Sequence, residues 1–540
     1  MLKHRTQSRA KHHSVNQSAS SAKIQKRRLS LPHIPLLLVA FLLFWLFASV
    51  VYRYVFYMAE QNTYFAFDRV AMYDVLSTPG GWLIMAGRFF LLSFHWPLLG
   101  GLVLSLLLTI IAWLIDYVFR LRGWWRALSV IPSYAFLAYI VSIQLNLYYE
   151  LDPGILFYVP LIALAVMTVV TLIVRLVSKR HLRCLFSLNK IENPLVEWGR
   201  GLIYLLMFVV LSVFALKTGD SALRTAHMQT LLQQNRYDEM IDVCKGMKHP
   251  TRTVCAYYAI ALSQTDRILD GMFDIFYQYP NIHLKNKTFT DDFGTNYYAA
   301  DCNFYSGLIT PAYHINMEQC VIGGLNVYRL KYMYLCCLIN GEIPLAEKYL
   351  RYIEQMPFEG QWVKEYRPML YNSKLISTDP ALAKVIELEP VSDAFEQSFS
   401  VPTFIGYNNS MLEGRSERAL MNSLASCLYT KNLPGVMDRY GALLQLGQQL
   451  PKVVEEAVLL YSIRDPKNVD ISKFTPYIVD IFRNFMSQAA QYKGKDAKYK
   501  GQMLKNQYLG FYPLYYFYEN VPDDNYNETT KVMKLGDRVN

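Results

Sequence analysis

Long apolar runs, several of them long enough to cross a lipid bilayer, dominate the first 216 residues, and shorter amphipathic segments follow. A helix needs about 20 mainly apolar residues to cross the ~30 Å hydrocarbon core. We therefore predict a transmembrane domain over residues 32–216. Its expected spans lie near residues 34–57, 98–119, 127–148, 155–177 and 198–216.

The apolar stretch from Gly81 to Phe119 has 39 residues and allows two interpretations. Pro97 separates residues 82–96 from the span near 98–119. The first piece has 15 residues, carries Arg88 inside it and has a tryptophan at each end. As a helix it would reach only about 22 Å, so we predict an interfacial or re-entrant helix. If it spans instead, the region after residue 216 emerges on the opposite side.

The basic residues are unevenly distributed, and their positions indicate membrane topology rather than nucleic-acid binding. Of the net charge of +11, residues 1–31 contribute +8 and contain no acidic residue. Residues 217–540 hold 34 basic and 35 acidic residues and are close to neutral. A protein that binds phosphate backbones concentrates basic residues on its folded domain. We therefore expect no nucleic-acid partner.

The loops between the spans indicate one orientation. Basic clusters at residues 120–126 and 179–200 flank spans, and cytoplasmic loops carry an excess of Lys and Arg. Five spans place both clusters on the side of residues 1–31, which we predict to be a disordered basic cytoplasmic arm. The N-terminus is then cytoplasmic, and the region from Lys217 onward lies outside.

After residue 216 the pattern predicts helices, so we expect an all-α protein: a bundle of about five transmembrane helices followed by an extramembrane helical-repeat domain. We divide the second part into a helical-repeat subdomain (217–379), an irregular linker rich in Pro and acidic residues (380–402) and a second helical subdomain (403–540). An aromatic segment at residues 511–518 is expected to cap the last helices. The alternative is that it forms an exposed partner-binding patch.

The segments around Asn235 and Asn340 have the pattern of a helical hairpin. In each, a helix ends in a short polar turn, an aromatic or aliphatic residue follows, and a proline closes the unit. Ala346 is small enough to let two antiparallel helices approach closely, although the first segment has Met240 at that position. The two asparagines are 105 residues apart, close to three repeats of ~34 residues. The segments resemble the tetratricopeptide repeat, which stacks into an α-solenoid.

The layout of the whole chain adds a second resemblance. Pro79-Gly80-Gly81 opens an apolar segment, and the helical region contains Tyr257-Tyr258-Ala259-Ile260-Ala261-Leu262 and Ala346-Glu347-Lys348-Tyr349-Leu350. With about five spans, this resembles an uncharacterised family of bacterial polytopic inner-membrane proteins with a C-terminal tetratricopeptide-like region. The resemblance implies a multi-pass protein of the bacterial inner membrane with a periplasmic C-terminal domain. It implies no activity.

The cysteines show no metal-ligand spacing. Seven of the eight lie after residue 216, and we expect most of them to be buried small hydrophobes. Cys244 and Cys255 are the nearest plausible disulfide pair in an oxidising compartment. The sequence also lacks a phosphate-binding glycine loop, a HExxH zinc helix, paired CxxC motifs and a nucleophile elbow. We therefore expect no metal and no cofactor.

These observations favour a membrane-anchored interaction or scaffold protein. Its partners would be the lipid bilayer and a protein or peptide bound by the helical-repeat domain. The alternative is an enzyme that acts on lipid-linked or cell-envelope glycans. In that case an acidic residue of the first outer loop, Asp68 or Asp74, would be catalytic and Arg88 would hold a phosphate. No precise role follows from the sequence alone.

Overall fold

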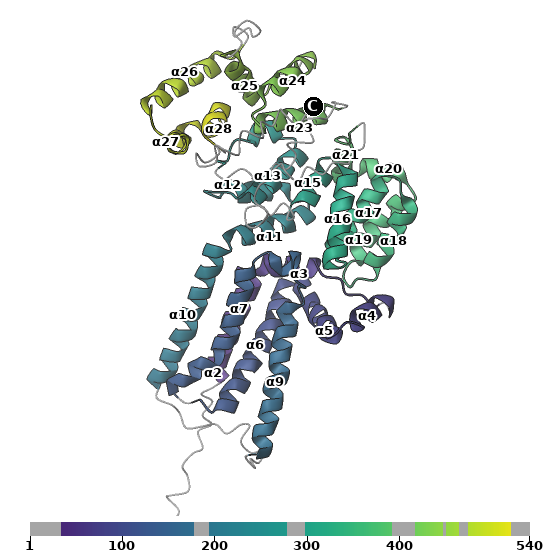
Figure 1. Cartoon of the computed structure of the whole chain (residues 1–540), viewed down its shortest axis with the longest axis vertical. Helices are drawn as coiled ribbons and strands as arrows, with labels where there is room; N and C mark the ends of the chain where they lie inside the picture. Colours follow the sequence, from purple (N-terminus) through teal and green to yellow (C-terminus); the bar gives the residue numbers. More distant parts are fainter. Residues whose placement is uncertain are drawn as a thin grey trace, which may run out of the picture.

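The protein is built from helices, as predicted. In the computed structural model, the residues described are 34–67, 69–121, 123–177, 194–277, 298–390, 416–446, 450–463 and 474–519. No strand occurs among them. Figure 1 shows an elongated molecule, with a bundle of long helices at one end and many shorter helices stacked above it. The end of the bundle that carries these shorter helices is called the domain end, and the opposite end the far end.

The bundle and the segment beside it contain twelve elements. They are α2 (Ile34–Leu46), η1 (Phe47–Val51), α3 (Arg53–Gln61), α4 (Arg69–Leu76), α5 (Gly81–Leu91), η2 (Leu92–His95), α6 (Pro97–Phe119), η3 (Gly123–Val130), α7 (Ile131–Ile143), α8 (Asn146–Tyr149), α9 (Ile155–Val177) and α10 (Pro194–Thr218). α6 packs against α2, α7 and α9, and α10 packs against α2 and α7.

Four of these helical segments are long and apolar enough to cross a membrane: α6, the continuous run η3–α7, α9 and α10. A fifth crossing is present if the bent pair formed by residues 36–51 and α3 counts as one span. A membrane protein is therefore indicated. The observed helices differ at their ends from the expected spans: α10 begins at Pro194, whereas the span predicted near 127–148 is interrupted at Gln144 (φ 51°).

The first predicted span, residues 34–57, is bent and not one straight helix. The chain was expected to cross from residue 34 to residue 57, but the helix breaks at Tyr52, where φ is −110° and ψ is 14°. α3 then continues at 70° to the preceding helix. The reason lies in Arg53 and Glu60, because charged side chains are costly in the hydrocarbon core. α3 instead buries its apolar face and packs against α11.

The stretch predicted as interfacial or re-entrant, residues 82–96, contains α5 and the 3₁₀ turn η2. α5 has 11 residues, which gives a length of about 16 Å. The chain then reverses at Trp96 into α6, which begins with Pro97. Proline suits this first helical position because its missing N–H would have no intrahelical partner there.

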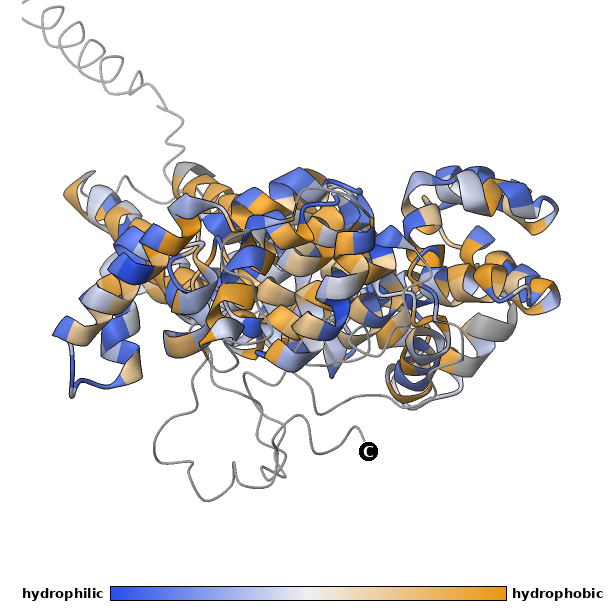
Figure 2. Cartoon of the chain, turned by 90° about the horizontal axis from the view of Figure 1, so that it is seen from above, coloured by the Kyte–Doolittle hydropathy of each residue, from blue (hydrophilic) through white to orange (hydrophobic). Residues whose placement is uncertain are grey.

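The helical domain begins one residue after α10. Its helices are α11 (Asp220–Gln233), α12 (Tyr237–Lys245), α13 (Arg252–Gln264), α14 (Ile268–Gly271), α15 (Ala299–Tyr305), α16 (Ile309–Gly323), α17 (Val327–Ile339), α18 (Ile343–Glu354), α19 (Gly360–Tyr366), η6 (Arg367–Leu370), α20 (Ser373–Thr378), α21 (Pro380–Ile386), α23 (Glu417–Tyr429), α24 (Leu433–Gln445), α25 (Lys452–Ser462), α26 (Pro476–Gln491), α27 (Ala497–Tyr508) and α28 (Tyr512–Tyr518). Figure 2 shows hydrophilic and hydrophobic residues interspersed along these helices, as amphipathic packing requires.

Five helix pairs in the described chain are joined by the same turn. In each pair one residue with positive φ follows the first helix, namely Asn235, Asp266, Gly307, Gly341 or Lys431. The amide after that residue donates to a carbonyl five positions earlier, as Glu342 N does to Cys337 O at 2.8 Å. This is the Schellman closure, which satisfies the last carbonyls of a helix. The recurrence gives the region a common hairpin unit.

The later helices pack directly on the earlier ones. α14 contacts α23 and α25, and the aromatic segment 511–518 forms α28, in which Tyr512 and Tyr515 are buried. Their hydroxyls donate to the carbonyls of Leu428 (3.1 Å) and Tyr429 (2.6 Å). The segment is therefore part of the core.

Two glycines in the shared turn provide a matched pair of substitutions. Gly307 and Gly341 both have left-handed φ, at 78° and 74°. A Cβ on Gly307 would lie 2.4 Å from the carbonyl carbon of Leu388, whereas one on Gly341 meets nothing within 4 Å. We expect Gly341→Ala to cost about 1–2 kcal/mol for the left-handed backbone. Gly307→Ala should cost a further ~1–3 kcal/mol of overpacking.

Thermal unfolding of the purified full-length protein in detergent measures the difference. Equal melting temperatures for the two variants would contradict the packing of residues 388–389 on this turn.

Candidate functional site

The three residues proposed for catalysis do not form a described cluster. Asp68 lies outside the described residues. Asp74 lies on α4, but the position of its side chain is not described. Arg88 lies on α5 and binds Asp152, with Nε and Nη2 at 2.9 Å and 2.5 Å from Oδ2. The two residues are 64 positions apart, so no local pattern could have paired them. The guanidinium predicted to hold a phosphate is already engaged by a carboxylate.

The Arg88–Asp152 pair holds α5 against the start of α9. Asp152 Oδ1 also accepts the amide of Gly154 at 2.7 Å. A Cβ on Gly87 would lie 2.6 Å from the carbonyl oxygen of Gly154, so only glycine permits this approach. The pair therefore fixes the position of the short helix beside the bundle.

The bundle meets the helical domain through an aromatic and a polar set of contacts, and we treat this junction as the candidate functional site. One part of it is aromatic. Phe358, in the turn between α18 and α19, packs on His95 and Trp96 with ring centroids 4.8 Å and 4.7 Å away. Its φ is 73°, which is rare for a bulky residue and signals a position fixed by its surroundings.

The same contact continues into α3 and the segment that follows it. His95 Nδ1 lies 3.8 Å from the buried carboxylate of Glu60. The amide of Phe65 lies 3.3 Å from the sulfur of Met356. The chain between α3 and α4 therefore runs along the bundle-facing end of α18.

The second part of the junction is polar and centres on Gln229 of α11, which is fully buried. Its Oε1 accepts the hydroxyl of Tyr148 at 3.0 Å. Its Nε2 donates to the hydroxyls of Tyr149 at 2.6 Å and Tyr257 at 2.9 Å. One amide thus joins α8, at the domain end of the bundle, to α11 and α13.

Asp301 of α15 extends this network. It accepts hydrogen bonds from the hydroxyls of Tyr257 (2.6 Å) and Tyr328 (2.7 Å). Burial raises the pKa of Asp301, while the tyrosine hydroxyls and Arg329 oppose that shift. The guanidinium of Arg329 also lies over the ring of Tyr149, 5.7 Å from its centroid.

The chemistry of this network is positional. Asp301 and Tyr257 are 2% and 0% exposed, so no substrate reaches them. Each hydroxyl that touches Asp301 donates to its carboxylate, which stabilises the charged form. Buried polar networks whose members are satisfied rigidify a structure and specify one arrangement. The junction therefore fixes the helical domain on the bundle.

The described residues offer no metal centre and no disulfide. No group of three or more His, Cys, Asp or Glu side chains among them is placed to hold a metal ion. The seven described cysteines are buried and free, so the pairing of Cys244 with Cys255 does not form. Cys184 lies outside the described residues.

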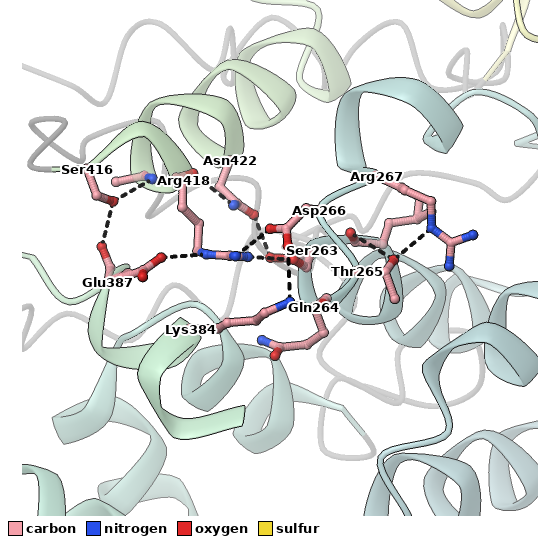
Figure 3. Close-up of polar contacts among 12 residues, drawn as sticks. Ser263, Gln264, Thr265, Asp266, Arg267, Lys384, Glu387, Ser416, Arg418 and Asn422 are labelled. Carbon is pink, nitrogen blue, oxygen red and sulfur yellow. Dashed lines mark hydrogen bonds and ion pairs between the residues drawn. The ribbon is translucent and has the colours of Figure 1, made fainter. Parts of the chain in front are cut away.

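A second polar cluster joins the two halves of the helical domain (Figure 3). Arg418 of α23 donates from Nε to Glu387 at 2.8 Å and from Nη1 to the carbonyl of Ser263 at 2.9 Å. Its Nη2 also pairs with Asp266. Cations are favourable at the C-terminus of a helix because of the helix dipole, and Ser263 lies in the last turn of α13.

Lys384 completes this cluster from α21. It donates to the carbonyl of Gln264 and pairs with Asp266 at 3.1 Å. The segment 380–402 was predicted as an irregular linker, but its first part is this helix. Asp379 caps the helix by accepting the amides of Ala381 and Leu382, a preferred start signal that pattern reasoning passed over in favour of the prolines.

Two buried glutamates hold the end of the described chain. Glu456 Oε2 accepts the amide of Tyr512, and Glu519 Oε2 accepts the amide of Tyr277, both at 2.8 Å. Burial raises the pKa of Glu456 to about 7 and that of Glu519 to about 8. Burial also lowers the pKa of Lys431 to about 8, and its Nζ donates to the carbonyl of Glu519 at 2.7 Å.

Comparison with known proteins places the chain in a family. Residues 29–188 and 145–519 match the family described as "Family of unknown function (DUF6057)", and the chain belongs to it. The prediction of an uncharacterised family is confirmed in that form. No curated protein and no solved structure matches the chain.

The junction predicts different consequences for two neighbouring tyrosines. Tyr257→Phe removes the hydroxyl that links Gln229 to Asp301, whereas Tyr258→Phe removes a bond to the carbonyl of Gly271 within the helical domain. Each loss should cost about 1–3 kcal/mol, because a buried partner is left unsatisfied. Only Tyr257→Phe should accelerate amide hydrogen exchange in residues 144–150. Equal exchange in both variants would show that the network does not join the two parts.

Glu456 predicts a pH-dependent stability. Its folded-state pKa of about 7 exceeds the ordinary 4.5, so its ionisation penalty grows as pH rises from about 4.5 to about 7. Glu456→Gln should therefore raise the free energy of unfolding by roughly 3 kcal/mol at pH 8 and by little at pH 5. Thermal melts at the two pH values test this, with Glu347→Gln on the surface of α18 as the control. A gain that is the same at both pH values would contradict the assignment.

Proposed function

We propose that this protein is a membrane-anchored interaction protein whose helical-repeat domain binds a protein or peptide on the periplasmic side of a bacterial inner membrane. The recurring hairpin is the observation that carries the proposal. Five helix pairs close with one Schellman turn, and the positive-φ residues of the first four are 31, 41 and 34 positions apart. Stacked helical hairpins of this length form extended surfaces that bind proteins.

The distribution of basic residues supports the proposed orientation. Arg175 at the end of α9 lies over the ring of Tyr117 near the end of α6. Arg200 of α10 donates to the carbonyl of Gly123 at the start of η3. These contacts bring the ends of α6 and α9 and the starts of η3 and α10 together at the far end. The basic clusters that the sequence carries at residues 120–126 and 179–200, next to these helix ends, support a cytoplasmic location for this end.

α26 and α27 lie at one side of the helical domain, away from the bundle (Figure 1). Each buries one face and leaves large side chains exposed on the other, with Tyr477 65%, Met503 47% and Tyr499 37% exposed. Lys495 lies over the ring of Tyr499 at 5.7 Å. Tyrosine and methionine are enriched in interfaces. We assign the partner surface to the exposed faces of α26 and α27.

The enzyme alternative has less support. It needs Arg88 as a phosphate ligand, but that side chain is paired with Asp152. Asp68 and Asp74 are therefore retained as residues to test and not as a proposed site.

A photo-crosslinking amino acid placed in the full-length protein, in its own cells, tests the interaction. We expect a discrete light-dependent adduct from positions 477 and 499, where exposed aromatic side chains face outward. Tyr371, which is 77% exposed between η6 and α20, is the matched control. Adducts should persist in Asp68→Asn and Asp74→Asn, because an interaction surface does not use these carboxylates.

A topology reporter fused after Gly219 tests the orientation separately. A periplasmic signal is expected. A cytoplasmic signal, or the absence of any discrete adduct at positions 477 and 499, would contradict the proposal.

A further inference from the structure

The end of α16 and the short turn that follows it carry an apolar surface that the folded protein leaves open. Val321 and Ile322 are adjacent and 74% and 76% exposed, and Met317 and Leu325 beside them are 40% and 38% exposed. Two glycines lie between Ile322 and Leu325, and no charged residue occurs between Glu318 and Arg329. We call residues 321–325 the α16–α17 tip.

Two adjacent apolar side chains that are both about three-quarters exposed are unusual at the end of a helix in water. Single exposed apolar residues are normal on a protein surface, but contiguous ones mark a binding or membrane-contact site. The tip also lacks the polar residues that surface loops usually carry.

The position of the tip relative to the bundle indicates which surface the tip contacts. α17 begins next to the tip, and Arg329 in its first turn lies over Tyr149, at the domain end of the bundle. The α18–α19 turn lies at the same end of these helices, where Phe358 packs on Trp96. Trp96 directly precedes the span α6, so the tip lies near the level at which the chain enters the membrane.

Figure 1 agrees with this placement. α16 runs down toward the bundle, and its lower end lies beside α3, above α5. Aromatic and apolar side chains are also exposed on α5 and at the start of α6. Trp82 is 66% exposed, Trp96 51% and Leu98 61%. Tryptophan is enriched at the boundary between lipid and water. The tip and these exposed side chains therefore lie at the same end of the bundle.

We propose that the α16–α17 tip inserts the side chains of Val321 and Ile322 into the adjoining leaflet of the membrane that the bundle crosses. The helical domain then has a second membrane contact, separate from its attachment through α10. This inference concerns a lipid surface, and it does not depend on the partner proposed for α26 and α27.

An environment-sensitive fluorophore on the full-length protein tests the proposal. Ile322→Cys, in a Cys184→Ser background, is labelled with a nitrobenzoxadiazole dye and reconstituted into phosphatidylethanolamine–phosphatidylglycerol nanodiscs. The seven remaining native cysteines are buried, and the background protein without the new cysteine gives the residual labelling. Tyr371→Cys is the matched control, because its 77% exposure is close to the 76% of Ile322, whereas the neighbouring helix α20 lies at the end of the α16–α20 group that is farther from the bundle (Figure 1).

Lipids that carry a doxyl quencher in the acyl chain should quench the dye at position 322 at least about twofold more than at position 371, with a blue-shifted emission. Equal quenching at the two positions would overturn the proposal. A blue shift without lipid quenching, lost on dilution with unlabelled protein, would assign the tip to a contact between two copies and would also overturn it. Unchanged melting temperatures of the labelled variants confirm that the fold is intact.

Discussion

The structure depends on the way its last span continues into the helical domain. α10 ends at Thr218 and α11 begins at Asp220, so Gly219 alone separates them. A longer linker would let the domain move freely relative to the membrane. With one residue between two helices, the direction of α11 is set by α10 and by the packing of α11 on α3. The bundle therefore orients every helix that follows.

The junction reinforces this orientation with polar contacts that are costly to break. Gln229 is fully buried and bonded to three tyrosines from two parts of the chain. Separation of the domain from the bundle would strip these groups of their partners, and a buried polar group without a partner costs about 1–3 kcal/mol. The aromatic contact of Phe358 with His95 and Trp96 acts at a second point. Two separated contacts resist rotation in a way that one cannot.

Hydrophobic patterning was sufficient for the fold class and for most of the long helices, because crossing a bilayer demands a length and a composition that few other constraints produce. It failed at Tyr52, where a charged residue within an aromatic run turned the chain, and in residues 380–386, where a capped helix was taken for a linker. Hairpin turns were visible in the sequence around Asn235 and Asn340, and the turn at Lys431, between α23 and α24, closes in the same way.

The candidate site was not predictable in the same way. Arg88 was singled out correctly as an unusual charge, but its partner Asp152 is 64 residues away. Gln229 looked like an ordinary polar residue of an amphipathic helix, and its role appears only when α8, α11 and α13 are assembled. Pattern reasoning detects periodicity along a helix and does not report which helices meet. For that reason it found the elements and missed the junction.

The cluster of Figure 3 bears on the order in which the protein can be completed during synthesis. The last carbonyls of α13 receive their cations from Lys384 and Arg418, which the ribosome adds more than a hundred residues later. The amide of Tyr277 can bind its acceptor, the carboxylate of Glu519, only after 242 further residues have been synthesised. Contacts this distant in sequence form late and leave earlier segments incomplete in the meantime. The spans are therefore synthesised long before the helical domain can be completed. The domain stays incompletely folded until Glu519, the last described residue, has been synthesised.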